Sequence, residues 1–138
     1  MKVLGRHLIA EYTGCAPAIL NDASYVEESL LEAVRQSGAT IVRSVFHHYA
    51  PQGVSGVVVI AESHMSVHTW PEYGYAAVDF FTCGQTVDPY RANACLAEKL
   101  GCRQAIVSEI KRGIPSETDE VISHKPIALT VPSTGTLG

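Results

Sequence analysis

The sequence has few charged residues and no excess of basic ones. Of 138 residues, 10 are Lys or Arg and 14 are Asp or Glu, which gives 17% charged residues and a formal net charge of −4. Proteins that bind nucleic acid or an anionic membrane through charge carry a basic surface, so we expect neither partner. The length fits one domain over residues 1–138. With so few charges, much apolar surface needs covering, and self-association is one way to cover it.

Long hydrophobic runs and paired cysteine motifs are also missing. The longest strongly apolar run, Val57–Ala61, is far shorter than the roughly 20 residues needed to cross a bilayer. Charge interrupts the apolar residues of Met1–His7 too early for the core of a signal peptide. The four cysteines form no C-x-x-C pair; they are Cys15, Cys83, Cys95 and Cys102. We therefore expect reduced thiols in a cytoplasmic protein.

Alternation of apolar and polar residues predicts several strands. Residues 64–70 alternate clearly, which places His64, Ser66, His68 and Trp70 on one face. Residues 57–61 are apolar throughout, so we expect a strand that is buried on both faces. Further strands are expected over residues 2–12, 39–49, 75–83 and 103–110.

Two helices are predicted between these strands. In the first, apolar residues recur at helical spacing over 26–34, and Gly38 ends it. Its cap is Ser24, which has capping-box spacing to Glu27, or else residue 21 or 22.

The second helix is expected to begin at Asp88-Pro89 and to end at Gly101. A parallel sheet needs a crossover helix between most pairs of strands, and only two helices are predicted among many strands. A parallel sheet therefore does not fit the predicted order of elements. We expect an α+β fold: a two-layer sandwich with a mainly antiparallel sheet and both helices on one face.

Side chains that can carry chemistry concentrate between residues 53 and 84. They are Ser55, Glu62, Ser63, His64, Ser66, His68, Trp70, Glu72, Asp79 and Cys83. A serine or cysteine activated by a histidine would indicate nucleophilic catalysis, but no G-x-S-x-G turn frames a serine. Isolated serines and histidines also occur at strand ends without any catalytic role. The residue types alone therefore leave the chemistry open.

A metal site is a second interpretation. His47, His48, His64 and His68, with a carboxylate or Cys83, are suitable ligand types, but the sequence has no H-E-x-x-H motif. On a strand, His64 and His68 share a face but lie about 13 Å apart, at roughly 3.3 Å per residue. That separation is too large for one ion, so the pattern gives little support for a metal.

The central block resembles the bacterial and archaeal S-adenosylmethionine decarboxylase family. The similar string runs over residues 55–72, SGVVVIAESHMSVHTWPE, and continues over 75–84, YAAVDFFTCG. The flanks are similar too, at Gly5-Arg6-His7, Asn21-Asp22 and Lys111-Arg112. The resemblance covers almost the whole chain and is far more specific than any short motif.

The resemblance implies a proenzyme that cuts itself between Glu62 and Ser63. The serine hydroxyl attacks the preceding carbonyl and converts the amide to an ester; elimination and hydrolysis then leave a pyruvoyl group at residue 63. The products would be residues 1–62 (beta chain) and 63–138 (alpha chain), the latter with 138 − 62 = 76 residues. His68 matches the residue that moves protons during processing, and imidazole suits this role because its usual pKa is about 6.5. Ser55 matches a residue that supports the oxyanion; as a plain turn residue it would need no such role.

The mature reaction implied by the resemblance is decarboxylation of S-adenosylmethionine, which supplies an aminopropyl donor for spermidine biosynthesis. The pyruvoyl ketone forms a Schiff base with the substrate amine and accepts the electrons left when carbon dioxide departs. Cys83 matches the proton donor, and a thiol with a usual pKa near 8.5 is largely protonated at neutrality. Neither a metal nor pyridoxal phosphate is required. The resemblance also implies a dimer of processed pairs with sites near the interface.

Substrate recognition is expected from Tyr49, Trp70 and Glu72. Aromatic faces suit adenine and a sulfonium, whereas the Glu72 carboxylate could accept hydrogen bonds from ribose hydroxyls. Tyr49 and Trp70 could instead be packing residues, and Glu72 could be part of a surface turn between Pro71 and Gly74. The family more often has Phe where this chain has Tyr49.

Two other functions remain open from the sequence. Some relatives with the same processing site decarboxylate arginine or ornithine, because the pyruvoyl chemistry needs only an α-amino acid. A relative that binds a ligand but never processes is the other alternative.

Overall fold

A computed structural model describes residues 3–114 of the chain. Six strands, three α-helices and one short 3-10 helix lie within this range. In chain order they are β1 (Gly5–Thr13), α1 (Pro17–Leu20), α2 (Ala23–Ser37), β2 (Ile41–His48), β3 (Val54–Ile60), β4 (Ser63–Trp70), η1 (Pro71–Tyr73), β5 (Tyr75–Cys83), α3 (Pro89–Leu100) and β6 (Gln104–Arg112).

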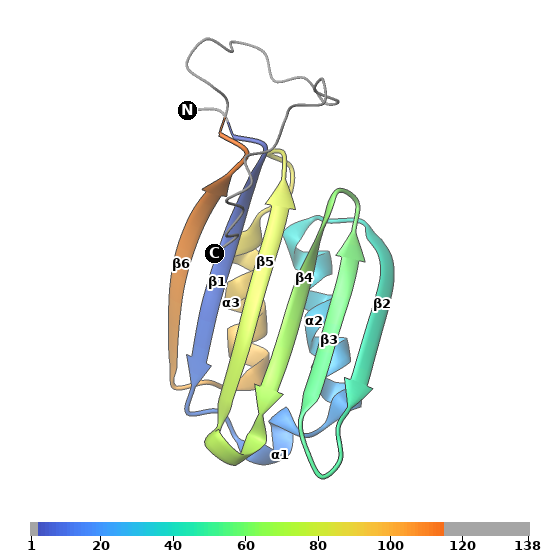
Figure 1. Cartoon of the computed structure of the whole chain (residues 1–138), viewed down its shortest axis with the longest axis vertical. Helices are drawn as coiled ribbons and strands as arrows, with labels where there is room; N and C mark the ends of the chain where they lie inside the picture. Colours follow the sequence, from blue (N-terminus) through green and yellow to red (C-terminus); the bar gives the residue numbers. More distant parts are fainter. Residues whose placement is uncertain (1–2, 115–138) are drawn as a thin grey trace, which may run out of the picture.

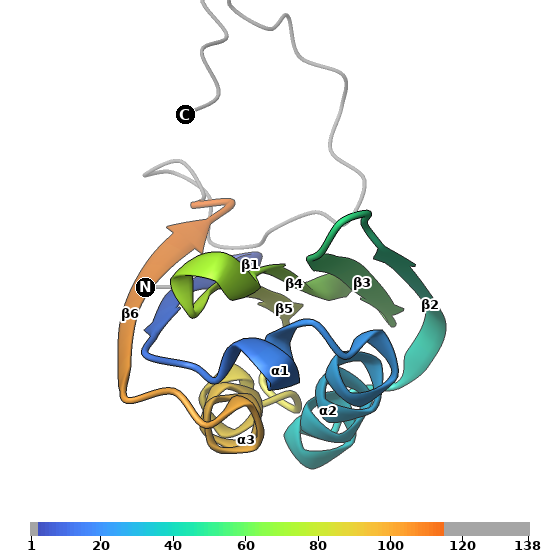
Figure 2. The ribbon, with the colours of Figure 1, turned by 90° about the horizontal axis from the view of Figure 1, so that it is seen from below.

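The strands form one sheet in the order β2-β3-β4-β5-β1-β6, and every neighbouring pair is antiparallel. Helices α2 and α3 lie side by side across one face of this sheet (Figures 1 and 2). No helix among residues 3–114 covers the opposite face, which we call the open face. The predicted two-layer α+β sandwich is confirmed.

The helix ends follow local capping chemistry. Asp22 is the N-cap of α2, because its Oδ1 accepts the Tyr25 N–H at 3.1 Å, and Gly38 ends the helix at φ 85°. Ser24 lies inside the first turn, so among the three caps considered Asp22 is confirmed, and Ser24 and Asn21 are wrong. Asp88 and Gly101 bound α3 as predicted.

Helix α1 was not predicted. Its four residues begin with Pro17, a residue that also disfavours continuation of the preceding strand. Proline is also well suited to the first position of a helix, because its fixed φ is helical and its missing N–H has no partner there. This short helix places Leu20 and Asn21 beneath the pocket described below.

The core lies between the sheet and the helices. Its largest fully buried side chains include Tyr12, Phe80, Leu8, Leu30 and Leu96. Burial alternates along β5, so that every second residue enters this core.

Strand β3 corrects one expectation. It begins at Val54 and alternates in burial, with Val58 fully buried and Val59 40% exposed. The apolar run at 57–61 is therefore not buried on both faces. Helices cover only one face of the sheet, so Val57 and Val59 lie on the open face next to the edge strand β2.

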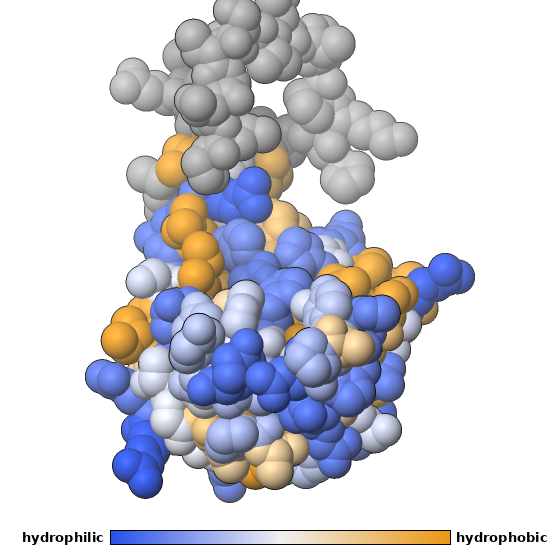
Figure 3. Space-filling model, turned by 60° about the horizontal axis from the view of Figure 1, so that its bottom comes forward, coloured by the Kyte–Doolittle hydropathy of each residue, from blue (hydrophilic) through white to orange (hydrophobic). Residues whose placement is uncertain are grey.

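The open face carries several exposed apolar residues. Five of them are each at least 39% exposed, and the strand register places all five on this face: Ile9, Val45, Val59, Ile106 and Ile110. In Figure 3 the most hydrophobic residues lie toward the two sides of the molecule, with hydrophilic residues between them. Such a surface is suited to association.

Candidate active site

The predicted site residues fall into two groups at opposite ends of the sheet. Glu62, Ser63 and Cys83 form one group, at the turn between β3 and β4 and the end of β5; we call it the cleavage end. The second group lies around the other ends of β3 and β4 and is called the pocket end. It consists of Tyr49, Ser55, His68, Trp70 and Glu72.

The backbone at the cleavage end adopts an unfavourable conformation. Glu62 has φ 70°, and it is the one non-glycine residue with positive φ among residues 3–114. This left-handed conformation is disfavoured for a residue with a Cβ and costs about 1–3 kcal/mol. The predicted scissile bond follows this residue directly.

Ser63 is the first residue of β4, and its hydroxyl lacks a partner. Its Oγ is buried and makes no hydrogen bond; in the described part of the chain, only Thr82 Oγ1 shares this property. Buried polar atoms are normally satisfied, and an exception needs a reason. A hydroxyl that is free to attack the neighbouring carbonyl provides one.

Cys83 closes β5 beside this turn. Burial raises the pKa of the Cys83 thiol, and the nearby negative charge of Glu62 raises it further. Gly5 is its partner on β1, and a methyl group there would lie 3.3 Å from Cys83 Sγ and 2.7 Å from the Phe81 ring. The raised pKa favours the protonated thiol, and Gly5 allows the β1 backbone to pack closely against it.

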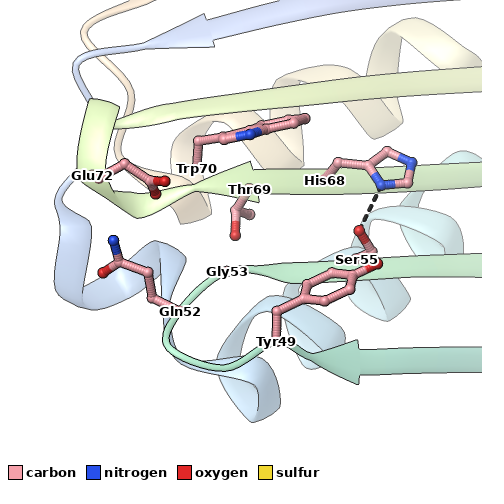
Figure 4. Close-up of a pocket in the computed structure, with 8 residues that line it drawn as sticks. All are labelled: Tyr49, Gln52, Gly53, Ser55, His68, Thr69, Trp70 and Glu72. Carbon is pink, nitrogen blue, oxygen red and sulfur yellow. Dashed lines mark hydrogen bonds between the residues drawn. The ribbon is translucent and has the colours of Figure 1, made fainter.

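The pocket end surrounds a cavity of about 310 Å³ (Figure 4). This volume lies at the lower end of the range for small-molecule sites. All five residues of this group that were predicted from the sequence line it, together with three that were not predicted. Those three are Gln52, Gly53 and Thr69.

Ser55 and His68 are directly hydrogen-bonded. They are cross-strand partners on β3 and β4, and Ser55 Oγ lies 2.7 Å from His68 Nδ1 (Figure 4). A hydroxyl and an imidazole in this arrangement can transfer a proton or orient each other.

Aromatic and acidic side chains surround the rest of the cavity. Tyr49 is 46% exposed and packs edge-on against His47, with ring centroids 4.6 Å apart. Trp70 is 41% exposed and lies against Tyr75. Glu72 belongs to η1 and faces the same cavity from the Trp70 side (Figure 4). Tyr49 and Trp70 are thus not core residues, which removes the packing alternative.

The two groups do not meet within one chain. Ser63 and His68 are five residues apart on a continuous strand, which corresponds to about 17 Å. His68 therefore cannot reach the scissile bond of its own chain in this structure.

A polar cluster occupies the open face between the two ends. Asp79 Oδ2 lies 2.6 Å from His7 Nε2 and 3.0 Å from His64 Nε2, and Ser66 donates to the other oxygen of Asp79. Burial alone would raise the pKa of Asp79, but the hydrogen bonds from Ser66 and His7 and the neighbouring His64 outweigh it. The pKa of Asp79 is therefore lowered. His7 lies 72 residues from Asp79 in the sequence, and no local pattern predicts their contact.

This cluster has ligand types that metals use. Candidate ligand atoms of His7, His64 and Asp79 all lie within 4.8 Å of one another. However, Asp79 already accepts hydrogen bonds from the protein, and an Arg112 nitrogen lies 3.4 Å from His7 Nδ1. A nearby guanidinium repels a cation, so the arrangement is explained by hydrogen bonding without an ion. The histidine set considered from the sequence is not brought together, because His64 and His68 lie at separate positions along β4.

Comparisons with known proteins identify the family of this chain. A sequence model of the family described as S-adenosylmethionine decarboxylase matches residues 6–113. The chain belongs to the S-adenosylmethionine decarboxylase family.

Relatives in this decarboxylase family match over most of their length. The S-adenosylmethionine decarboxylase proenzyme of Carboxydothermus hydrogenoformans is 53% identical over 117 residues, covering 85% of this chain and 92% of that protein. The proenzyme of Pelotomaculum thermopropionicum is 53% identical over 118 residues, covering 86% and 94%. The crystal structure of the adenosylmethionine decarboxylase of Aquifex aeolicus superposes with a TM-score of 0.80 at 34% identity, covering 88% of this chain and all of that one.

The helices of this decarboxylase-family chain are short. Over residues 3–114, none is both long and apolar enough to cross a membrane.

Proposed function

We propose that this chain is a pyruvoyl-dependent S-adenosylmethionine decarboxylase that is made as a proenzyme and cuts itself between Glu62 and Ser63. The observation that carries the proposal is the junction itself, where a left-handed Glu62 precedes a buried, unpartnered Ser63 hydroxyl. Relatives that are 53% identical are named proenzymes, which supports a processed chain. The products are residues 1–62 and 63–138.

Ser63 performs the first step of processing. Its hydroxyl oxygen bonds to the Glu62 carbonyl carbon, the Glu62–Ser63 C–N bond breaks, and an ester replaces the amide. The freed nitrogen takes up the hydroxyl proton. Elimination then breaks the ester and releases residues 1–62, which end in a new C-terminal carboxylate at Glu62. Hydrolysis of what remains of residue 63 releases its nitrogen as ammonia and leaves a pyruvoyl group. The left-handed backbone at Glu62 raises the free energy of the uncut chain, which favours the rearrangement that relieves it.

The residues around the junction fit a pyruvoyl group. This group supplies a carbonyl that binds the substrate's amino group and accepts the electron pair left when carbon dioxide departs. Cys83 lies beside it, and burial raises the pKa of the thiol, which therefore keeps its proton at neutral pH. We assign Cys83 as the group that delivers a proton to the substrate's α-carbon. A cytoplasmic location, where thiols stay reduced, suits this role.

The pocket end binds the nucleoside part of the substrate. Tyr49 and Trp70 offer exposed aromatic faces to the adenine ring and the sulfonium, and Glu72 offers acceptors to ribose hydroxyls. His68 and its partner Ser55 serve the processing step.

Two copies of the chain complete each site. His68 lies about 17 Å from Ser63 in one chain and Trp70 lies farther along the same strand, so a second copy must bring its pocket end to the cleavage end of the first. An antiparallel pair with two-fold symmetry does this twice and forms two equal sites. His68, Trp70 and the five exposed apolar residues of the open face named above lie on the same side of the sheet, which supports this face as the contact surface.

The experiment is a substrate comparison with the purified protein. Carbon dioxide release is measured with S-adenosylmethionine, arginine and ornithine, with and without prior borohydride reduction. We expect release from S-adenosylmethionine alone, and loss of activity after reduction of the carbonyl. Release from arginine or ornithine instead would overturn the substrate assignment, and activity that survives reduction would overturn the pyruvoyl assignment.

A further inference from the structure

The C-terminal end of α1 connects the two walls of the pocket. The Leu20 carbonyl accepts a hydrogen bond from Thr69 Oγ1 at 2.8 Å, and the same oxygen of Thr69 accepts the Val54 N–H at 2.9 Å. The next residue, Asn21, accepts the Gly53 N–H through its Oδ1 at 2.9 Å. Gly53 and Thr69 both line the cavity, so consecutive residues of α1 and its cap hold opposite walls.

The loop over residues 49–53 carries one of these walls. The Tyr49 N–H donates to the Gly53 carbonyl at 2.8 Å, which closes the loop. Gly53 has φ 108°, and a side chain there would lie 3.2 Å from the Thr69 carbonyl oxygen. Asn21 Oδ1 also lies 2.9 Å from His48 Nε2, so one amide oxygen holds both sides of the loop.

We propose that Asn21 is a positioning residue for the substrate pocket. Asn21 does not itself line the cavity, but its Oδ1 holds the loop that presents Tyr49 and Gln52 to the substrate. The proposal rests on the proposed function of the pocket, and it adds a residue that comes from a distant part of the chain. Neither aromatic stacking nor the processing step requires this oxygen.

The physical role is preorganisation. Without the Asn21 oxygen, the Gly53 N–H would turn to water and the loop would sample several conformations. Binding would then have to order the Tyr49 side chain and its backbone, which weakens affinity without changing the reacting groups. The requirement is for an acceptor at this position, so aspartate can replace asparagine whereas alanine cannot.

The test compares Asn21→Ala, Asn21→Asp and the unaltered protein in full-length, processed form. We expect Asn21→Ala to raise KM for S-adenosylmethionine about tenfold, with kcat and self-cleavage within about twofold of the unaltered protein. Asn21→Asp should restore KM to within about threefold. Gln36→Ala, which removes an exposed amide bonded to Glu32, is the matched control and should change neither constant.

Hydrogen exchange of the Gly53 amide provides a measurement that needs no activity. The exchange rate should rise at least tenfold in Asn21→Ala and stay near the original in Asn21→Asp. The proposal is overturned if KM does not change in Asn21→Ala, or if KM is the same in Asn21→Ala and Asn21→Asp. It is also overturned if kcat and self-cleavage in Asn21→Ala fall as much as KM rises. If the unaltered protein does not decarboxylate, the proposed function fails, and unchanged Gly53 exchange in Asn21→Ala then also rejects the positioning role.

Discussion

Ser63 and His68 lie five residues apart on strand β4, and alternation along the strand directs them to opposite faces of the sheet. About 17 Å separates them, yet the proposed processing chemistry requires both at one bond. In the antiparallel pair that we propose, His68 of one copy reaches the Glu62–Ser63 bond of the other.

Mixing two inactive variants tests this shared site. Ser63→Ala retains an intact His68, and His68→Ala retains an intact Ser63. Co-expression should therefore yield cleaved His68→Ala chains, whereas each variant expressed alone should stay largely uncut. A denaturing gel with mass spectrometry identifies the cut chain. If co-expression leaves both chains intact, the shared-site arrangement is wrong.

Replacing the attacking serine removes processing altogether. Ser63→Ala has no oxygen to attack the Glu62 carbonyl, so we expect one uncut chain of 14.8 kDa and no decarboxylation. Ser24→Ala, an exposed serine on α2, is the control and should be cut normally. A Ser63→Ala chain that is still cut after Glu62 would refute self-processing by this hydroxyl.

Replacing Cys83 separates processing from turnover. Cys83→Ser should still be cut, because Ser63 and the partner's His68 are intact. Turnover should fall about a hundredfold or more, since an alcohol is a far weaker acid than a thiol. Cys95→Ser, on α3, should keep both properties. Normal turnover in Cys83→Ser would remove this thiol from proton transfer.

The Asp79 cluster predicts acid sensitivity. Hydrogen bonds from Ser66 and His7, with the neighbouring His64, outweigh burial and lower the pKa of Asp79, so the stabilisation is complete above the ordinary aspartate pKa of about 3.9. It is lost as pH falls through the lower folded-state value. Asp79→Asn in the uncut Ser63→Ala background should reduce the free energy of unfolding by about 1–3 kcal/mol at pH 7.

The difference between the two proteins should shrink as the pH falls below about 4, as measured by urea unfolding. Asp22→Asn is the matched control, because asparagine caps a helix about as well as aspartate. An Asp79→Asn effect that stays constant down to the acid limit would contradict the lowered pKa.

Much of the fold could be predicted because it depends on local patterns. Alternation over 64–70 and the Asp88 and Gly101 caps identify their elements without any tertiary information. By contrast, the apolar run at 57–61 does not show which face is covered, since that depends on where the helices pack. Helix α1 was missed because Pro17 is compatible with ending a strand and with starting a helix.

The site was identified by the resemblance, and its geometry depends on strand order. The sequence similar to the family around Ser63 identified the site residues. It did not show that Ser63 and His68, five residues apart in sequence, lie far apart in space. His7 meets Asp79 across 72 residues because β1 inserts between β5 and β6. The contact of Asn21 with Gly53 likewise depends on how α1 packs, for which the sequence carries no local signal.

The most direct measurement of the central claim is the intact mass of the purified protein with analysis of its new terminus. We expect two chains, residues 1–62 and 63–138. The second should begin with a carbonyl group that reacts with hydroxylamine, and this chain should therefore resist Edman degradation. A single chain of 14.8 kDa, or a cut chain beginning with an ordinary serine amine, would contradict it.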